Sequence, residues 1–284
     1  MSTYKWLVTG ASAGLGAQIA LAALRAGHSV IATARNVSKA RSTYPKIEDL
    51  GGSWLELDVT STNTEEIIAE AVKEERVNVI VNNAGYALEG PFEALSLDQV
   101  RLQFDTNVFG AFAVMKGCIP TFRERRNGTI VNISSTAGIC PLPSLSAYAA
   151  SKFALEGMSE ALYAELAPIN IRVLLVEPGA YRTDFITALQ SNEIMAPYVG
   201  TAADKVSKKF RAMHGKQGGD PAKAAIAIVE AVTGEGRGKD VQGHLRLVLG
   251  KDAVARVLAR TEQFAQNVEA LRHISEWAVF PEGE

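Results

Sequence analysis

The chain has 284 residues, of which 47% are hydrophobic and 21% charged, a composition typical of a globular protein with a large core. Its net charge of −2 gives no electrostatic basis for binding nucleic acid or an anionic membrane. No apolar run reaches about 18 residues, and the first residues lack the pattern of a signal peptide, so we expect a cytoplasmic protein with no integral membrane span.

The cysteines and histidines predict no metal site. Cys118 and Cys140 stand in apolar surroundings without the spacing of metal ligands, which is typical of reduced thiols in a core. None of the four histidines fits a catalytic or metal-binding constellation.

Short β-rich apolar runs alternate with longer helical patterns along the chain. This alternation predicts an α/β protein with a parallel sheet and right-handed crossovers. The expected strands span residues 5–9, 29–34, 53–57, 77–81, 128–134, 171–177 and 245–249. The expected helices span residues 14–26, 62–75, 97–125, 147–166, 221–233 and 253–277.

The first expected strand leads into a glycine-rich loop, residues 9–16 (TGASAGLG), which opens the first helix. Gly10 permits a tight turn, Gly14 lets a pyrophosphate approach the backbone, and Gly16 lets helix and strand pack closely. Free N–H groups at the helix start would then face a negative ligand. A strand before the loop and an amphipathic helix after it predict a dinucleotide site.

The end of the second expected strand indicates which dinucleotide is bound. A site for NAD commonly has Asp or Glu there, about twenty residues past the loop, to bond the ribose 2′-hydroxyl. This chain has Thr33 and Ala34, followed by Arg35. A guanidinium can pair with a 2′-phosphate, which a carboxylate would repel, so the pattern predicts NADP(H). The alternative interpretation of Arg35 is a surface arginine with no role in cofactor binding.

Asp58 follows the third expected strand. Its carboxylate could accept a hydrogen bond from the adenine amino group. It could equally serve as a helix N-cap or turn residue.

Tyr148 and Lys152 are four residues apart on the helix expected over residues 147–166, so they project from one face. A free tyrosine has a pKa near 10, and a cation one turn away lowers it. The pair is therefore a candidate proton donor and acceptor at neutral pH. The alternative is an ordinary surface pair of the kind that many helices carry.

Residues 185–220 interrupt the strand and helix pattern. The segment is irregular, with four glycines, and carries Phe185, Met195, Tyr198, Phe210 and Met213. A long insertion with apolar side chains favours a substrate-binding loop or lid. A packed helical excursion or an interface element remains the alternative.

Residues 251–284 form an expected C-terminal helical extension. Its apolar residues recur near helical spacing, which favours packing onto the body or a partner over catalysis. They are Val254, Val257, Leu258, Phe264, Val268 and Leu271.

With these residues in place, the chain resembles the short-chain dehydrogenase/reductase (SDR) family over residues 5–180. The resemblance implies one domain over residues 1–284 with a doubly wound Rossmann fold. Its seven-stranded parallel sheet would have the order 3-2-1-4-5-6-7, helices on both faces, and nicotinamide over the C-terminal strand ends. The matching motifs are residues 9–16, Asp58, residues 82–85 (NNAG), Asn107, residues 133–135 (ISS), Tyr148, Lys152, Pro178, Gly179 and Thr183.

The resemblance also implies catalytic roles. Tyr148 would exchange a proton with the substrate oxygen, and Lys152 would bond the nicotinamide ribose and stabilise the phenolate. Ser135, thirteen residues before the tyrosine, is selected over Ser134 to hydrogen-bond the substrate oxygen. Asn107 would hold a water that links Lys152 to solvent, although without the family it is better explained as a polar group satisfied inside a helix.

A set of cofactor contacts is implied by the same resemblance. Asn83 would hydrogen-bond in the centre of the sheet, whereas Ala84 and Gly85 would leave room for the adenosine ribose. Pro178 and Gly179 would pass beside nicotinamide, unless they form only a tight turn. The full expected set is Gly10, Ser12, Gly14, Leu15, Gly16, Arg35, Asp58, Val59, Asn83, Ala84, Gly85, Tyr148, Lys152, Pro178, Gly179 and Thr183.

The implied activity is that of an NADP(H)-dependent carbonyl reductase (ketoreductase) or secondary-alcohol dehydrogenase acting on an apolar, steroid- or retinoid-like small molecule. Some NADP-preferring members carry a basic residue at the position of Ala13, so the preference here depends on Arg35 and the missing carboxylate. The family also suggests a homodimer or homotetramer formed through the helices at residues 97–125 and 147–166.

Two alternatives remain. Sugar-nucleotide epimerases and dehydratases usually have differently spaced glycines and a larger C-terminal domain. A dinucleotide-sensing regulator would usually have lost the tyrosine or lysine.

Overall fold

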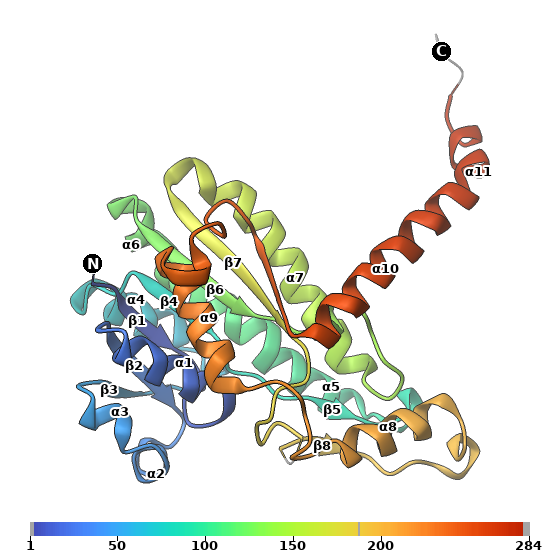
Figure 1. The fold of residues 1–284 in the computed structure, drawn as a ribbon, viewed down its shortest axis with the longest axis horizontal. Coiled ribbons are helices and arrows are strands. Elements are labelled where there is room, and N and C mark those ends of the chain that lie inside the picture. The colour runs from blue at the N-terminus through green and yellow to red at the C-terminus, as the bar shows by residue number, and fades with distance from the viewer. Residues whose placement is uncertain (1–2, 187, 281–284) are drawn as a thin grey trace.

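The apolar strands assemble into one seven-stranded parallel sheet in the computed structural model, which describes residues 3–186 and 188–280. The strand order is β3-β2-β1-β4-β6-β7-β9 (Figure 1), which confirms the order 3-2-1-4-5-6-7 when only these seven are counted. The strands are β1 (Lys5–Val8), β2 (Ser29–Ala34), β3 (Ser53–Glu56), β4 (Val79–Asn82), β6 (Gly128–Ile133), β7 (Ile171–Pro178) and β9 (Arg246–Leu249).

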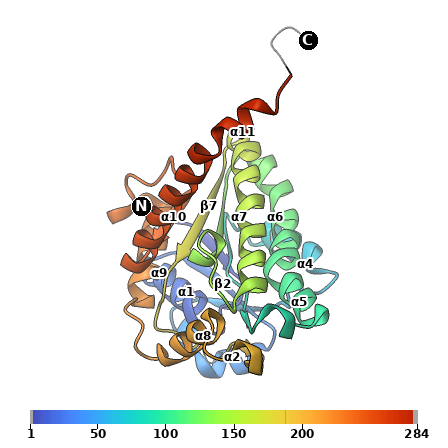
Figure 2. The ribbon, with the colours of Figure 1, turned by 90° about the vertical axis from the view of Figure 1, so that its right-hand side faces the viewer.

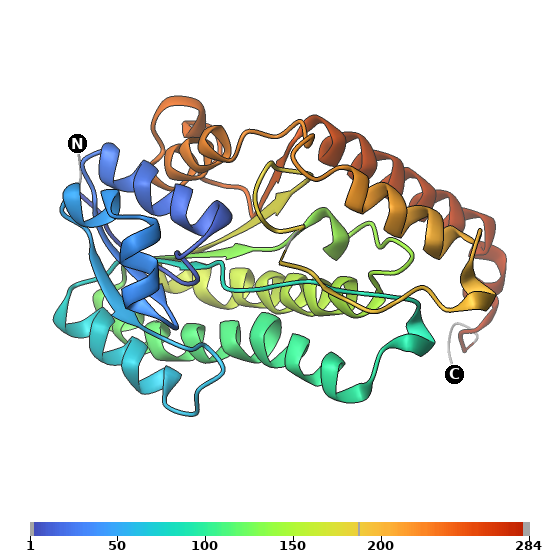
Figure 3. The same cartoon turned by 90° about the horizontal axis from the view of Figure 1, so that it is seen from below.

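Helices cover both faces of the sheet, as the layers in Figure 3 show. Because side chains alternate along a strand, Trp6 and Val8 join one core and Leu7 the other. The first core packs against α1 (Gly14–Arg25) and α9 (Pro221–Thr233). The second packs against α4 (Thr64–Glu74), α6 (Ala111–Arg125) and α7 (Ser146–Leu166).

A buried chain of amides fixes α7 against the centre of the sheet. The amide of Asn82 donates to Asn132 Oδ1 over 2.8 Å, and Asn132 Nδ2 donates to Ser159 Oγ over 2.8 Å. All three side chains are buried, where an unpaired amide would cost on the order of 1–3 kcal/mol. The chain therefore sets the position of α7 relative to the ends of β4 and β6.

Several elements differ from the expected pattern. The helix expected over residues 97–125 is α5 (Leu97–Phe104) and α6 joined by a π-helical turn, Asp105–Gly110. Two short helices, α2 (Val37–Thr43) and α3 (Lys46–Asp49), lie between β2 and β3.

The segment 185–220 is more ordered than its glycines suggested. It contains α8 (Ala202–Ala212) and a short strand β8 (Gln190–Ser191) that pairs with β5 (Leu88–Glu89). Ser191 Oγ donates to the buried Glu89 over 2.8 Å, and Gln99 bonds Asn192 over 2.9 Å. The prediction of an irregular segment was wrong for α8. Most residues of this helix are polar, so its few apolar residues give no clear helical periodicity in the sequence. Residue 187 lies outside the described residues.

The C-terminal stretch forms two helices, α10 (Lys251–Ala270) and α11 (Arg272–Trp277), where one was expected. Figure 1 shows α10 leaving the sheet and extending away from the body, and in Figure 2, seen from that side, α10 crosses in front of the body. Its apolar residues beyond the first turn are largely exposed, as Leu258 (66%) and Phe264 (63%) show, so they do not pack onto the body as one alternative had it. Residues 281–284 of the expected extension lie outside the described residues.

Within the described residues, no helix is both long and apolar enough to cross a bilayer. Both cysteines are free and buried, as the sequence predicts.

Candidate functional site

The glycine loop joins β1 to the N-terminus of α1 at the C-terminal edge of the sheet. Gly10 (φ +63°) and Gly14 (φ +55°) adopt the left-handed conformation, which costs other residues strain. Helix α1 begins without a side-chain cap and without an acidic residue in its first turn. Its first N–H groups and the positive end of its dipole are therefore available to an anion.

Asn83, directly after β4, holds this loop in place. Its Nδ2 donates to the carbonyls of Thr9 (2.9 Å) and Gly10 (3.1 Å). A Cβ on Gly16 would lie 2.3 Å from that nitrogen, and one on Gly10 would lie 2.9 Å from the Cα of Ala84. The Asn83 amide thus bonds the loop, rather than only the sheet centre, and requires glycine at position 16, whereas the backbone of Ala84 requires it at position 10.

The ends of β2 and β3 bring Arg35 near Asp58. Asp58 accepts hydrogen bonds from the backbone N–H (3.0 Å) and the hydroxyl (2.8 Å) of Thr60, which is the geometry of the turn alternative. Burial alone would raise its pKa, but these bonds and the charge of Arg35 lower it. Thr33 and Ala34 are buried and Arg35 is exposed, so the guanidinium is the charged group free to reach a ligand at the end of β2.

Tyr148, Lys152 and Ser135 come together at the end of β6. The ammonium of Lys152 donates to the carbonyl of Ile133 over 2.8 Å and lies 5.9 Å from the centre of the Tyr148 ring. The hydroxyl of Ser135 lies near enough to that of Tyr148 to lower its pKa, whereas Ser134 is buried. The serine that the family spacing selects is therefore the one beside the tyrosine.

Burial shifts the pKa values of this group in opposite directions. It raises the pKa of Tyr148 to about 12, although the neighbouring Ser135 hydroxyl opposes this. It lowers the pKa of Lys152 to about 8, against the charge of Glu156. The pKa of Tyr148 is therefore raised and not lowered as expected from the lysine, because burial penalises the phenolate.

Asn107 lies in the π-helical turn, and its side chain is engaged with the backbone of Tyr86. Its Oδ1 accepts from the Tyr86 N–H (3.1 Å), and its Nδ2 donates to the Tyr86 carbonyl (3.0 Å) and to Ser151 Oγ (3.0 Å). The side chain of Asn107 thus has hydrogen-bond partners for both its oxygen and its nitrogen, as expected for a polar residue inside a helix without reference to the family. A Cβ on Gly85 would lie 3.0 Å from Asn107 Oδ1 and 3.7 Å from Lys152 Nζ, so Gly85 keeps open the space between them.

The segment after β7 folds over the glycine loop. Ala180 N–H donates to Asp252 of α10 over 3.0 Å, and a Cβ on Gly179 would lie 2.5 Å from the same carboxylate. A Cβ on Gly14 would lie 3.7 Å from Thr183, so Thr183 faces the loop. Sequence reasoning missed Asp252, because no local pattern connects it with a turn 72 residues away.

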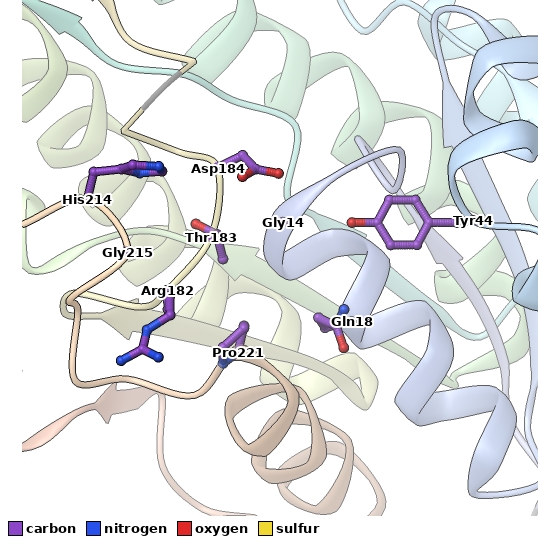
Figure 4. A pocket seen from close by; sticks show the side chains of 9 residues that line it. All are labelled: Gly14, Gln18, Tyr44, Arg182, Thr183, Asp184, His214, Gly215 and Pro221. Atoms are coloured by element: carbon purple, nitrogen blue, oxygen red, sulfur yellow. The ribbon is translucent and has the colours of Figure 1, made fainter.

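A cavity of about 330 Å³ borders the start of α1. In Figure 4 Tyr44 directs its hydroxyl toward the loop at Gly14, while Arg182 and His214 come from the opposite side. The cavity lies at the glycine loop and not beside Tyr148. It is lined by Gly14, Gln18, Tyr44, Arg182, Thr183, Asp184, His214, Gly215 and Pro221.

Apolar side chains cover the tyrosine. The rings of Tyr148 and Phe185 lie 5.8 Å apart between their centres. Leu142, Leu189 and Phe210 pack against the same small cluster. Phe185 and Leu189 lie between β7 and α8, and Phe210 lies in α8. Segment 185–220 therefore supplies an apolar cover for Tyr148 and the polar side chains beside it.

The residues fit a dinucleotide. Gly10, Gly16 and Gly85 stand where a Cβ would meet neighbouring backbone or an asparagine side chain. The start of α1, which has no side-chain cap, adjoins the loop. Lys152 and Ser135 lie beside the phenol of Tyr148. Within the described residues, no three His, Cys, Asp or Glu side chains come together as metal ligands would.

Comparisons with known proteins identify relatives along most of the chain. The family model for short chain dehydrogenases matches residues 5–194. The oxidoreductase claN of Passalora fulva is 50% identical over 208 residues, which are 73% of this chain and 95% of the relative. Retinol dehydrogenase 8 of Bos taurus is 37% identical over 207 residues, or 71% of this chain and 66% of the relative.

A crystal structure agrees with the whole fold. A short-chain dehydrogenase from Streptomyces avermitilis superimposes with a TM-score of 0.87 at 36% identity, covering 98% of this chain and 100% of the other.

The buried ammonium leads to a first prediction. Because the folded-state pKa of Lys152 is depressed from 10.5 to about 8, the charged form costs stability at neutral pH, and stability recovers as pH rises from about 8 to 10.5. We expect Lys152→Met to raise the free energy of unfolding at pH 7 by on the order of 2–3 kcal/mol, with little difference near pH 10.5, in urea titrations. Lys209→Met, at an exposed lysine, is the control. A variant that is less stable than the wild type at pH 7 would contradict the account.

Proposed function

The chain belongs to the short-chain dehydrogenase family, and we propose that it is an NADP(H)-dependent oxidoreductase that interconverts an apolar ketone or aldehyde with its alcohol. One observation carries the proposal: a phenol, a serine hydroxyl and a buried ammonium meet at the end of β6 beneath an apolar cover. The bound nucleotide would supply the hydride. The residues of the chain handle the proton and the developing charge.

The raised pKa of Tyr148, about 12, keeps the phenol protonated at neutral pH. A protonated phenol can donate to a carbonyl oxygen as that oxygen gains charge, which supports the direction of reduction. Ser135 would hydrogen-bond the same oxygen and stabilise it. Lys152, whose ammonium lies below the ring, would favour the phenolate once the proton has left and would bond the nicotinamide ribose. Asn107 and Gly85 would keep the space beside the ammonium open.

The preference for NADP(H) is supported by Arg35 and by the lack of a carboxylate at Thr33 or Ala34. Structures of this fold carry either cofactor: an enzyme from Sphingobium yanoikuyae is bound to NADPH and one from Burkholderia phymatum to NAD. The fold therefore leaves the choice to the end of β2, where a guanidinium favours a 2′-phosphate.

The apolar class of substrate is supported by the cover over Tyr148. Phe185, Leu142, Leu189 and Phe210 offer apolar surface and no charge, so a hydrophobic carbonyl compound would be desolvated there at little cost. The relative named as a retinol dehydrogenase is consistent with an apolar alcohol. We take segment 185–220 as the substrate-binding lid of a single domain.

Removing the proposed acid is the most direct chemical test. We expect Tyr148→Phe to lower kcat with NADPH and a panel of apolar ketones by about 10²–10⁴-fold, with NADPH affinity retained. Tyr163→Phe, in which the lost hydroxyl bonds Gly243 at the surface, should keep its activity. Turnover that survives Tyr148→Phe would remove the proposed acid, and an inactive wild type that binds NADPH tightly would favour a dinucleotide sensor.

Cofactor preference is tested at the end of β2. We expect Arg35→Asp to reduce the ratio of kcat/KM for NADPH over NADH by about 10–100-fold, because a charge-assisted bond becomes a repulsion. Arg123→Asp makes the same change of charge at an exposed position on α6 and should leave the ratio alone. A constant ratio in Arg35→Asp would mean that the arginine does not face the 2′-phosphate.

Self-association is proposed through α5–α7. These helices and the π-helical turn between α5 and α6 expose large apolar side chains, Leu102 (57%), Phe109 (61%), Phe112 (49%) and Phe153 (44%), of the kind that an interface between subunits would cover. We expect light scattering to report a homodimer or homotetramer that Phe109→Glu weakens. A wild-type mass equal to one chain at micromolar concentration would exclude it.

A further inference from the structure

A second cluster of charges lies directly behind the proposed catalytic group. Arg246, at the start of β9, forms ion pairs with Glu156 and Glu177 through one nitrogen, Nη1, and with Glu160 through Nη2. The side chain of Glu156 is 6% exposed and that of Glu177 is fully buried, whereas Glu160 is 57% exposed. Two buried carboxylates therefore share one donor nitrogen.

The two carboxyl groups hold fewer hydrogen bonds than their burial requires. Among the described residues, Glu156 Oε1 and Glu177 Oε2 have no donor partner. Two ionised carboxylates in such a place repel each other, and a proton kept by one of them relieves the repulsion and satisfies both oxygens.

The surroundings favour a proton that the two carboxyl groups hold between them. Burial and the charge of Glu156 raise the pKa of Glu177 to about 7. The pKa of Glu156 is raised as well, chiefly by burial, although the charge of Arg246 opposes this. At neutral pH the pair therefore carries between one and two negative charges, and one proton is still leaving it.

Glu156 lies four residues, or about one helical turn, after Lys152 on α7, and its charge opposes the lowering of the Lys152 pKa by burial. It also touches the strand end that carries Ser135: a Cβ on Gly138 would lie 2.9 Å from both Glu156 Cγ and Ser134 Oγ. The carboxylate is thus close enough to act on the ammonium by its charge, and it borders the loop that carries Ser134 and Gly138.

We propose that Glu156, which shares one proton with Glu177 on Arg246, is a positioning residue that keeps Lys152 in its charged form. The inference rests on the proposed function, in which that ammonium serves the phenol and the cofactor. No bond to the substrate is made, and the only proton that moves is the one shared by the pair.

The pair compensates for the burial of the lysine. As pH rises through about 7, the shared proton leaves and the pair gains a second negative charge. This happens just below pH 8, near which the buried Lys152 would lose its own proton. The added charge favours the ammonium. The other charged or titratable groups around the pair are Glu160 on α7, Arg246 on β9 and Cys140, which itself lies near Arg256 and Arg260 of α10.

The first measurement is a titration of the free protein by infrared spectroscopy, which detects protonated carboxyl groups. We expect one buried carboxyl to lose its proton near pH 7 in the wild type and in Glu160→Gln. That transition should be absent from Glu156→Gln and Glu177→Gln. A wild type with no carboxyl that titrates between about pH 6 and 8 would overturn the shared proton.

The second measurement is the pKa of Lys152 in free protein labelled with ¹³C in its lysines, assigned by Lys152→Met. We expect Glu156→Gln to lower that pKa by about one unit, and Glu156→Asp to restore most of it. Glu160→Gln removes a carboxylate from the same guanidinium at an exposed position, and should change the pKa by less than about 0.3 units. An equal effect of Glu156→Gln and Glu160→Gln would contradict the positioning role.

Both readouts are independent of cofactor and substrate, so they separate this inference from the proposed function. Should the protein prove inactive with every ketone, the titrations still decide whether Glu156 controls the lysine. If the protein is active, its kcat should fall at alkaline pH as Lys152 loses its proton. In Glu156→Gln this fall should begin at a lower pH, by the same amount as the Lys152 pKa is lowered, and kcat should drop by about tenfold one pH unit above the shifted pKa.

Discussion

Lys152 is a buried ammonium, and its 2.8 Å hydrogen bond to the carbonyl of Ile133 ties α7 to the end of β6. Every other feature of the candidate site is arranged around that charge. Tyr148 lies one turn earlier on the same helix, Ser135 follows the same strand, and Gly85 leaves the opposite side open. An ammonium in this place costs stability, which is typical of a group held for function rather than for folding. The amide chain from Asn82 through Asn132 to Ser159 keeps the helix in position despite that cost.

Much of the fold could be predicted from the sequence because its signals are local. Strands such as β4 are apolar on both faces, and the glycine loop between β1 and α1 has a mechanical reason for each glycine. The periodicity of α7 placed Tyr148 and Lys152 on one face, and the family spacing chose Ser135 over Ser134. The structure brings these side chains together, since parallel strands end at one edge of the sheet. Their chemical roles remain proposals.

Other features depend on contacts between distant residues, which no local pattern contains. Asp252 supports the turn at Gly179, and Arg246 gathers carboxylates from α7 and β7. The raised pKa of Tyr148 is a further case, because the spacing to Lys152 indicates an attraction but not the depth of burial that outweighs it. Helix α8 was missed since its apolar positions are few, and the pairing of β5 with β8 involves only two residues on each strand.

The central claim is that the phenol of Tyr148 meets both the reacting carbon of the cofactor and the substrate oxygen. A crystal structure of the complex with NADPH and an unreactive ketone analogue tests it most directly. The account predicts the Tyr148 hydroxyl within about 3 Å of the carbonyl oxygen, the nicotinamide C4 within about 3.5 Å of the carbonyl carbon, and Lys152 on the ribose. A complex in which the nicotinamide lies away from Tyr148, with Phe185 still packed against its ring, would contradict it.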